Sequence, residues 1–509
     1  ACVVTGSKSD HAGNCFRGTN FDKIGRLAKE VTVKACMRNP IKGPIVGGSL
    51  MCFAGYAFLG RRRQTTAVIA RAKGKPRPLK PGSVYPAKDL CSMCGLCDTS
   101  HIGRVREACA FLEDGMGRVD TMEEEVHGRS RDLQNEDELY FGVSQGIHQV
   151  RVPPRERPSK RGWTGVVTRI AVQMLQQDRV DAVICVASGD QPMLPRPILA
   201  RTVEEVLACG GVKPTLSPNL RPLEELKEGR HADVKRLLFI GVGCQVQALR
   251  AIEKDLNLEA LYVVGTNCSD NPRDGEALQR FLRSASETPE TATGFEFMQD
   301  NRVHIKHQDG RYERIPVFAL KEPHTCTGVI AKSCYACFDY VNALADLTIG
   351  YMASPWEDTP MTEHSQYCVV RNQRGREMVD VLLQADALEL GEQPSGGGLP
   401  REAFVGGVLS PELQLAFGKR EPREKDPPRW LTEVLADAIT SLGPRGIDFA
   451  KASIDRATLR NIICVRAQGE AGRGRAAPGV LPKHAAVLEE RYADIVASFV
   501  KDYEGSRVM

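Results

Sequence analysis

Apolar residues in the middle of the chain alternate between short continuous runs and one-sided periodic stretches. The runs have the length and composition of buried strands, and they are Val183–Val186, Leu237–Ile240 and Leu261–Val264. The periodic stretches place apolar residues on one helical face, and they are Trp163–Gln176, Thr202–Ala208 and Gln245–Asp255. Strands that alternate with helices at such short gaps are typical of an α/β core with parallel strands.

The pattern changes towards the C-terminus. Segments 295–303 and 304–317, which turn at Asp309-Gly310, predict an antiparallel hairpin. Cys368–Val370 reads as a strand, and Arg376–Leu388 as a helix. Residues 390–430 are rich in Gly, Pro and charge, which favours a mobile connection. The remainder, from Trp430 to Val508, predicts amphipathic helices at the periphery.

The first 80 residues differ from the rest in charge. They hold sixteen Lys and Arg residues but only three acidic ones, in a chain of net charge +4. A basic, acid-poor leader is typical of a targeting segment. Aromatic residues are not interleaved with its basic ones in the way that binds bases, so nucleic acid is not predicted as a partner. A small basic domain is the alternative, and the apolar run at 43–60 leaves a membrane anchor open.

Four cysteines near the start of the body suggest metal chemistry. Cys91, Cys94 and Cys97 are spaced by two residues, and Cys109 follows after eleven more. This spacing is used for iron–sulfur ligation, whereas zinc sites usually pair a C-x-x-C doublet with a second doublet or a His pair. Gaps this short are also poor for disulfides. The spacing predicts a [4Fe–4S] cluster, with zinc as the competing interpretation.

Four further cysteines form a second candidate set. Cys244 and Cys268 each follow a predicted strand and a Gly-containing turn, so both would lie at the carboxyl edge of the sheet, where ligands bind in open α/β folds. Cys334 and Cys337 form a C-x-x-C pair on another segment. The sequence leaves open whether the four meet, because a single cysteine after a strand is most often a small core residue.

Nucleotide binding is predicted at the same edge. Gly241-Val242-Gly243, between strand and helix, can cradle a phosphate, but Gln247 stands near where a dinucleotide fingerprint has its third glycine. A flavin held by several loops is therefore favoured over NAD. A flavin also joins the single-electron chemistry of a cluster to two-electron reductions. The Pro-bounded loop 213–219 can supply contacts, and a merely rigid turn is the alternative.

Several motifs resemble those of the deazaflavin-dependent hydrogenase/dehydrogenase β-subunit family, and within it a group of chlorophyll reductases. They are Gly-Val-Gly-Cys-Gln at 241–245, Gly-Thr-Asn-Cys at 265–268, Ser-Cys-Tyr-Ala-Cys-Phe-Asp-Tyr at 333–340 and Glu-Phe-Met-Gln-Asp at 296–300. The resemblance implies two [4Fe–4S] clusters, held by the two cysteine sets, and FAD. The predicted FAD contacts are Lys213, Thr215, Ser217, Asn219, Gly241, Gly243, Gln245, Thr266 and Asn267.

The resemblance also implies a substrate. The loop between Gly350 and Val369 resembles that of members reducing the C7 hydroxymethyl group of a chlorophyll, whereas members reducing the 8-vinyl group have a shorter loop. Expelling the hydroxyl group requires a proton donor, for which His364 on this loop is the candidate, with Tyr335 and Asp339 as rivals. The vinyl reductase and a non-catalytic electron-transfer subunit are the alternative functions.

Together these observations predict four regions. Residues 1–84 would be a chloroplast transit peptide and linker, 85–162 an iron–sulfur module, 163–390 a mixed α/β core with FAD and the second cluster, and 391–509 a connection and a helical tail. The resemblance implies reduced ferredoxin as the donor, a chlorophyll-type pigment as the substrate, weak thylakoid association and a homo-oligomer, with a trimer expected.

Overall fold

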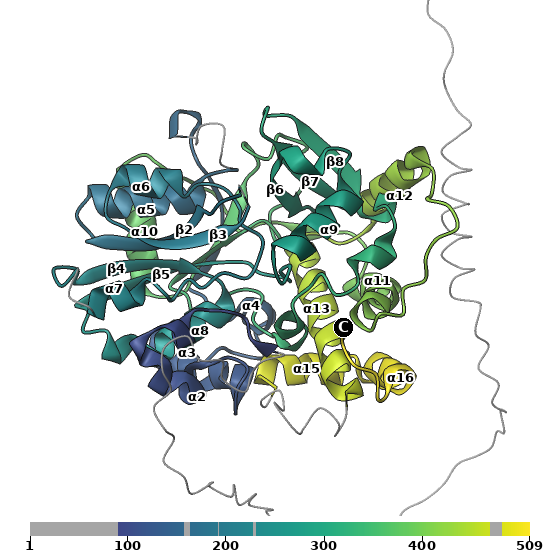
Figure 1. The fold of residues 1–509 in the computed structure, drawn as a ribbon, viewed down its shortest axis with the longest axis horizontal. Helices are drawn as coiled ribbons and strands as arrows, with labels where there is room; N and C mark the ends of the chain where they lie inside the picture. Colours follow the sequence, from purple (N-terminus) through teal and green to yellow (C-terminus); the bar gives the residue numbers. More distant parts are fainter. Residues whose placement is uncertain (1–89, 157–162, 192, 228–230, 469–480) are drawn as a thin grey trace, which may run out of the picture. The chain divides into compact units, whose positions relative to one another are not determined.

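A mixed eight-stranded sheet forms the centre of the fold (Figure 1). The computed structural model describes residues 90–156, 163–191, 193–227, 231–468 and 481–509. In spatial order the strands are β11 (Glu389–Leu390), β1 (Gly146–Arg151), β10 (Gln366–Val370), β9 (Leu347–Gly350), β5 (Ala260–Thr266), β4 (Arg236–Gly241), β2 (Ala182–Ser188) and β3 (Pro195–Ala200).

The predicted parallel strands lie in the middle of this sheet. β2, β4, β5 and β9 run parallel, which confirms the α/β core. The outer strands β3, β10, β1 and β11 are antiparallel to their neighbours. The connection from β2 to β3 spans only residues 189–194, too short for the crossover that a parallel neighbour needs.

Helices cover both faces of the sheet, because successive strand residues point to opposite sides. Leu238 of β4 faces a core with α5, α6 and α10, whereas Leu237 and Phe239 face a core with α2, α3, α7 and α8 (Figure 1). The first group is α5 (Val166–Gln176), α6 (Val203–Ala208) and α10 (Gln373–Gln384). The second group is α2 (Val105–Ala108), α3 (Val119–His127), α7 (Leu223–Lys227) and α8 (Gly243–Ile252). α4 (Glu136–Phe141) precedes β1.

A smaller three-stranded sheet consists of β6 (Ala292–Phe297), β7 (Arg302–His307) and β8 (Tyr312–Pro316). The predicted turn at Asp309-Gly310 joins β7 to β8, but the predicted single strand 295–303 is wrong, since a turn at 298–301 separates β6 from β7. One face carries Phe295 and Ile305 and packs on α9 (Gly275–Ala285). The opposite face carries Glu296 and His304, which are register partners.

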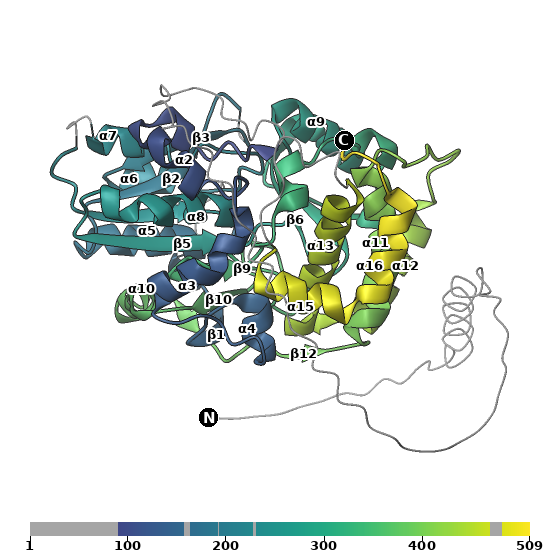
Figure 2. The same cartoon turned by 90° about the horizontal axis from the view of Figure 1, so that it is seen from below.

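The C-terminal region is more ordered and more central than its composition suggests. It contains α11 (Arg401–Ala416), α12 (Arg429–Leu442), α13 (Ile447–Ala467), α15 (Lys483–Arg491) and α16 (Ala493–Tyr503), with the short pair β12 (Gly396–Gly397) and β13 (Arg445–Gly446) (Figure 2). The expected irregular connection at 390–430 is wrong, because α11 buries Val405, Leu409 and Leu413. The tail is not peripheral either, since α13 is mostly buried.

No described helix combines the length and hydropathy needed to cross a bilayer. The predicted transit peptide, linker and alternative membrane anchor lie outside the described residues. β1, from the region predicted as the iron–sulfur module, pairs with β10 of the predicted core. The division into four regions stays a prediction.

Candidate site of two cysteine sets and a flavin loop

The first cysteine set lies on a tight loop followed by two short helical turns. Cys97 is in the turn Leu96–Asp98, and Cys109 ends α2. The backbone N–H of Met93 donates to Cys91 Sγ at 3.3 Å. Burial, and then repulsion by Cys109, Cys244 and Cys97, raise the pKa of Cys94 well above its ordinary value. Cys91, the exposed member, contributes in the same direction as burial to the raised pKa values of Cys97 and Cys109.

The second set is assembled from three segments. Cys244 is the second residue of α8, Cys268 follows β5 by two residues, and Cys334 and Cys337 lie on and after the helical turn Lys332–Ala336. This confirms that Cys244 and Cys268 lie at the carboxyl edge of the sheet. Burial raises the pKa of Cys268, and the neighbouring Cys334 and Cys244 raise it further. The amide of Asn271 donates to Cys268 Sγ at 3.2 Å.

The two sets adjoin each other through Cys244. Its pKa is raised to about 11 by burial, with Cys109 of the first set contributing, while a hydrogen bond from the Ser92 hydroxyl acts in the opposite direction. All described cysteines are free thiols, so the disulfide alternative is wrong for this part of the chain. Within that part, no three Cys, His, Asp or Glu side chains converge closely enough for a single metal ion.

Helix α13 holds the second set in place. Asn461 Nδ2 donates to the carbonyl oxygens of Cys334 and Cys337, both at 2.7 Å. The Arg460 guanidinium binds both carboxylate oxygens of Asp270, at 2.7 and 2.8 Å, and lies 5.0 Å from the centre of the Tyr335 ring. These residues are not among those predicted from the sequence. The sequence feature that could have indicated Arg460 and Asn461 is a polar Arg-Asn pair between Leu459 and Ile462 in an otherwise apolar stretch.

The predicted flavin loop packs against the first cysteine loop. The backbone N–H of Leu220 donates to the carbonyl of Cys94 at 2.9 Å. Gly95 has φ +93°, and a Cβ there would lie 2.7 Å from the Pro218 carbonyl oxygen, so the close approach requires glycine. The side-chain amide of Gln245 donates to the Ser217 carbonyl at 2.8 Å. The loop is thereby fixed to the N-terminus of α8.

The predicted flavin-binding side chains differ in whether they already have hydrogen-bond partners in the protein. Thr215 Oγ1 is buried and has no hydrogen-bond partner among the described residues, which suits a missing ligand. Lys213, in contrast, donates to the carbonyls of Cys209, Gly210 and Gly211 at 2.5–3.1 Å, so a cofactor contact would require exchange of one of these bonds.

The remaining predicted contacts lie at the ends of two parallel strands. Asn219 binds the Ile240 carbonyl at 3.2 Å, and Thr266 ends β5. Asn267 follows and is packed closely against Gly350, at the end of β9. Gly243 begins α8 after Gly241 and is packed against Asp339, since a Cβ at Gly243 would lie 2.5 Å from Asp339 Oδ2. A carboxylate of this chain thus already lies against the predicted phosphate cradle.

The three predicted proton donors do not form one site. Tyr335 lies beneath Arg460, and Asp339 Oδ1 accepts from the backbone N–H of Ala343 at 2.8 Å. His364 is buried; its Nδ1 donates to the Ser365 carbonyl at 2.7 Å, and its Nε2 accepts from the Glu357 N–H at 3.3 Å. Both ring nitrogens are therefore engaged by backbone. The catalytic roles of these three residues stay predictions.

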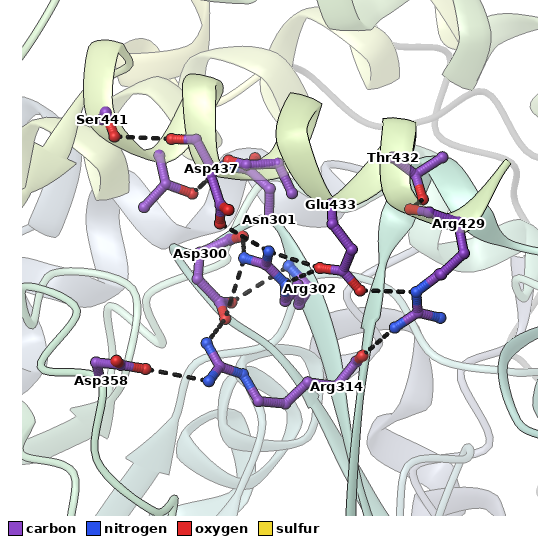
Figure 3. Close-up of polar contacts among 12 residues, drawn as sticks. Asp300, Asn301, Arg302, Arg314, Asp358, Arg429, Thr432, Glu433, Asp437 and Ser441 are labelled. Atoms are coloured by element: carbon purple, nitrogen blue, oxygen red, sulfur yellow. Dashed lines mark hydrogen bonds and ion pairs between the residues drawn. The ribbon is translucent and has the colours of Figure 1, made fainter. Parts of the chain in front are cut away.

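A polar network fixes the small sheet to α12 and to the loop after β9 (Figure 3). Arg302 binds Glu433 and Asp437 of α12, both at 2.7 Å. Arg314 binds Asp300 at 3.0 Å and Asp358 at 3.1 Å. The Arg314 guanidinium also lies over the ring of Trp356. The loop between Gly350 and Val369, predicted to distinguish the substrates, is thus held against the face of β6–β8 that carries His304 and Arg314.

Comparisons with known proteins agree with this arrangement. The N-terminal part of the coenzyme F420 hydrogenase/dehydrogenase β subunit matches residues 149–224, and its C-terminal part matches 234–395. The chloroplastic 7-hydroxymethyl chlorophyll a reductase of Oryza sativa is 47% identical over 85% of this chain and 90% of its own length. The chain belongs to the coenzyme F420 hydrogenase/dehydrogenase β-subunit family.

Two further proteins are also similar to this chain. An uncharacterized protein of Nostoc sp. is 44% identical over 77% of this chain and 91% of its own length. The coenzyme F420 hydrogenase β subunit of Methanosarcina barkeri is 27% identical over 42% of this chain and 73% of its own length. The family resemblance inferred from the motifs is therefore confirmed.

Proposed function

We propose that this chain is an oxidoreductase that converts 7-hydroxymethyl chlorophyll a to chlorophyll a. The observation that carries the proposal is the 47% identity to the rice reductase over most of both chains. The reaction replaces a hydroxymethyl group by a methyl group. It consumes two electrons and two protons and releases water, so the protein must conduct electrons and supply a proton.

Two sets of four thiols are suited to the electron path. Cys91, Cys94, Cys97 and Cys109 would hold one [4Fe–4S] cluster, and Cys244, Cys268, Cys334 and Cys337 the other. The contact between Ser92 and Cys244 supports direct transfer between them. Cys91 is exposed, so an electron donor would approach the first set.

The donor set of the flavin loop fits FAD. Thr215 offers an unpartnered hydroxyl, and the loop lies against the first cysteine motif through Leu220 and Cys94. When bound, FAD would couple the single-electron chemistry of the clusters to a two-electron reduction. The residues of the loop would bind the cofactor and exclude water from it.

The remaining features of the proposal extend from the rice relative and the motifs. Reduced ferredoxin would be the donor, and the protein would act in the chloroplast, as the rice relative's name states for that protein. A homo-oligomer, a trimer in particular, and weak association with thylakoids complete the proposal.

An anaerobic turnover assay tests the function. The purified protein, with iron and sulfide measured and FAD added, is supplied with reduced ferredoxin and 7-hydroxymethyl chlorophyll a. Chlorophyll a is expected by liquid chromatography, and a Cys337→Ala variant should form little. Divinyl chlorophyllide a is the parallel substrate, and its conversion in place of the hydroxymethyl pigment would overturn the proposal. Reduction of the cofactors without conversion of either pigment would indicate an electron-transfer subunit.

A further inference from the structure

One carboxyl group on the small sheet, on the face that carries His304 and Arg314, takes part in none of the polar contacts among the described residues of that face. Glu296 belongs to β6, on the face opposite to the apolar one that packs on α9. It is half-buried, and among the residues that the structure describes none forms a hydrogen bond or ion pair with its carboxyl group. Burial alone raises the pKa of Glu296 to about 8.

Segments that the proposed function brings together lie beside the strand that carries Glu296, since a Cβ at Gly294 of β6 would lie 3.2 Å from the Trp163 ring nitrogen. An apolar and aromatic cluster of Trp163, Met298 and Met361 packs with Val212, Tyr312, Tyr351 and Trp356. Val212 directly precedes the flavin loop, whereas Tyr351 and Trp356 lie on the loop expected to distinguish the substrate. A flat, apolar macrocycle requires walls of this kind.

Tyr351 connects Glu296 to the edge of the main sheet. It follows β9, and its pKa is raised by burial and then by the charge of Glu296, which places the two groups close to each other. The Tyr351 hydroxyl lies 3.3 Å from Thr164 Oγ1, which in turn donates to the side-chain oxygen of Gln366 at 2.5 Å. Glu296 itself remains available to a ligand.

Other ionisable groups on this face are engaged elsewhere. His304, the register partner of Glu296, contacts Asp300 at 2.9 Å. Lys306, two residues along β7 from His304, lies 5.8 Å from the centre of the ring of its register partner Tyr312. Burial lowers the pKa of Lys306 and raises that of Tyr312. Among the described acidic groups of this face, Glu296 is therefore the one whose carboxyl group has no hydrogen-bond or ion-pair partner.

We infer that Glu296 is the proton donor to the departing hydroxyl group, an assignment that rests on the proposed function. The carbon–oxygen bond at the C7 substituent breaks, and the oxygen leaves as water with the proton of Glu296. The electron pair that completes the methyl group, together with the second proton, would be supplied by bound FAD. Glu296 is left as a carboxylate, which solvent reprotonates because the side chain is half-buried and not fully enclosed.

The test compares Glu296→Gln, Glu296→Asp and the exposed control Glu290→Gln in the cofactor-loaded protein. General acids typically contribute about 10²–10⁴ in rate, so Glu296→Gln should lower turnover by at least about 100-fold. Turnover of the wild type should fall as the pH rises through the pKa of Glu296. This alkaline limb of the pH–rate profile should be absent in Glu296→Gln. Glu296→Asp should retain the limb at an intermediate rate, and Glu290→Gln should behave as the wild type.

A readout independent of turnover is the infrared carbonyl stretch of a protonated carboxyl group. At pH 7 one such band should be lost in Glu296→Gln but kept in Glu290→Gln, with pigment affinity unchanged in both. The assignment would be overturned if Glu296→Gln turned over within about tenfold of the wild type and kept the alkaline limb of the pH–rate profile. An infrared spectrum unchanged by Glu296→Gln would also overturn it. If the wild type fails to convert the pigment, the proposed function fails instead, and the infrared band still reports the protonation of Glu296.

Discussion

The ion pair between Arg460 and Asp270 should be a main support of the second cysteine set. The Arg460 side chain is 2% exposed and Asp270 17%, and two hydrogen bonds of 2.7 and 2.8 Å join them. Removing one partner of such a buried pair leaves an uncompensated charge, which typically costs about 3–5 kcal/mol. Arg460→Met keeps much of the side-chain volume, so the expected loss is electrostatic.

Arg466 offers a matched control on the same helix. It binds Glu489 at 2.9 Å, but its side chain is 52% exposed, so Arg466→Met should cost at most about 1 kcal/mol. The free energy of unfolding is measured in urea under anaerobic conditions, together with iron and sulfide content. Arg460→Met should lower the unfolding midpoint much more than Arg466→Met and release about half of the iron, since the first set does not contact this pair. Equal midpoints and equal iron in the two variants would refute the reasoning.

Two further changes test the flavin loop and a buried carboxyl group. Thr215→Val removes a hydroxyl that has no hydrogen-bond partner among the described residues, so the stability of the protein should be unchanged. FAD affinity, followed by flavin fluorescence, should weaken about fivefold or more, as for one lost hydrogen bond of about 1 kcal/mol. Unaltered affinity would remove Thr215 from the FAD site. Burial raises the pKa of Asp455 from 3.8 to about 6. The wild type should therefore lose about 3 kcal/mol of stability as the pH rises from about 3 to about 7. Asp455→Asn should lack this loss in urea unfolding, and identical pH profiles would contradict the assignment.

Local sequence signals identified the elements whose stability is local. β2, β4 and β5 coincide with short apolar runs, and Thr202 caps α6 with Glu205 in a capping box. The antiparallel pairing of β1 with β10 could not be predicted, because it joins residues more than 200 positions apart. Strand direction there is decided by contacts that no local pattern records.

The missed helix α11 has a different cause. Its buried residues Val405, Leu409 and Leu413 recur every fourth position, but Gly406, Gly407 and Pro411 obscured this period. The site shows the same limit. The spacing placed Cys91, Cys94, Cys97 and Cys109 within one short segment, whereas Cys244, Cys268 and the C-x-x-C pair come from distant segments, of which Asn461 of α13 holds the last. Whether each set binds a cluster stays a prediction. Glu296 was visible only as part of a motif.

A change in the first cysteine loop should be felt in the flavin loop, because the two pack directly against each other at Gly95 and Leu220. At Gly95 an alanine would adopt φ +93°, costing about 1–2 kcal/mol, and its Cβ would clash with the backbone of Pro218 and Arg221. Gly95→Ala should therefore reduce both iron content and FAD affinity, by displacing the loop that carries Thr215. Gly103→Ala is the control, since no atom lies within 4 Å of a Cβ there. If Gly95→Ala lost iron but bound FAD as tightly as Gly103→Ala, the packing of the cysteine loop would not set the position of the flavin loop.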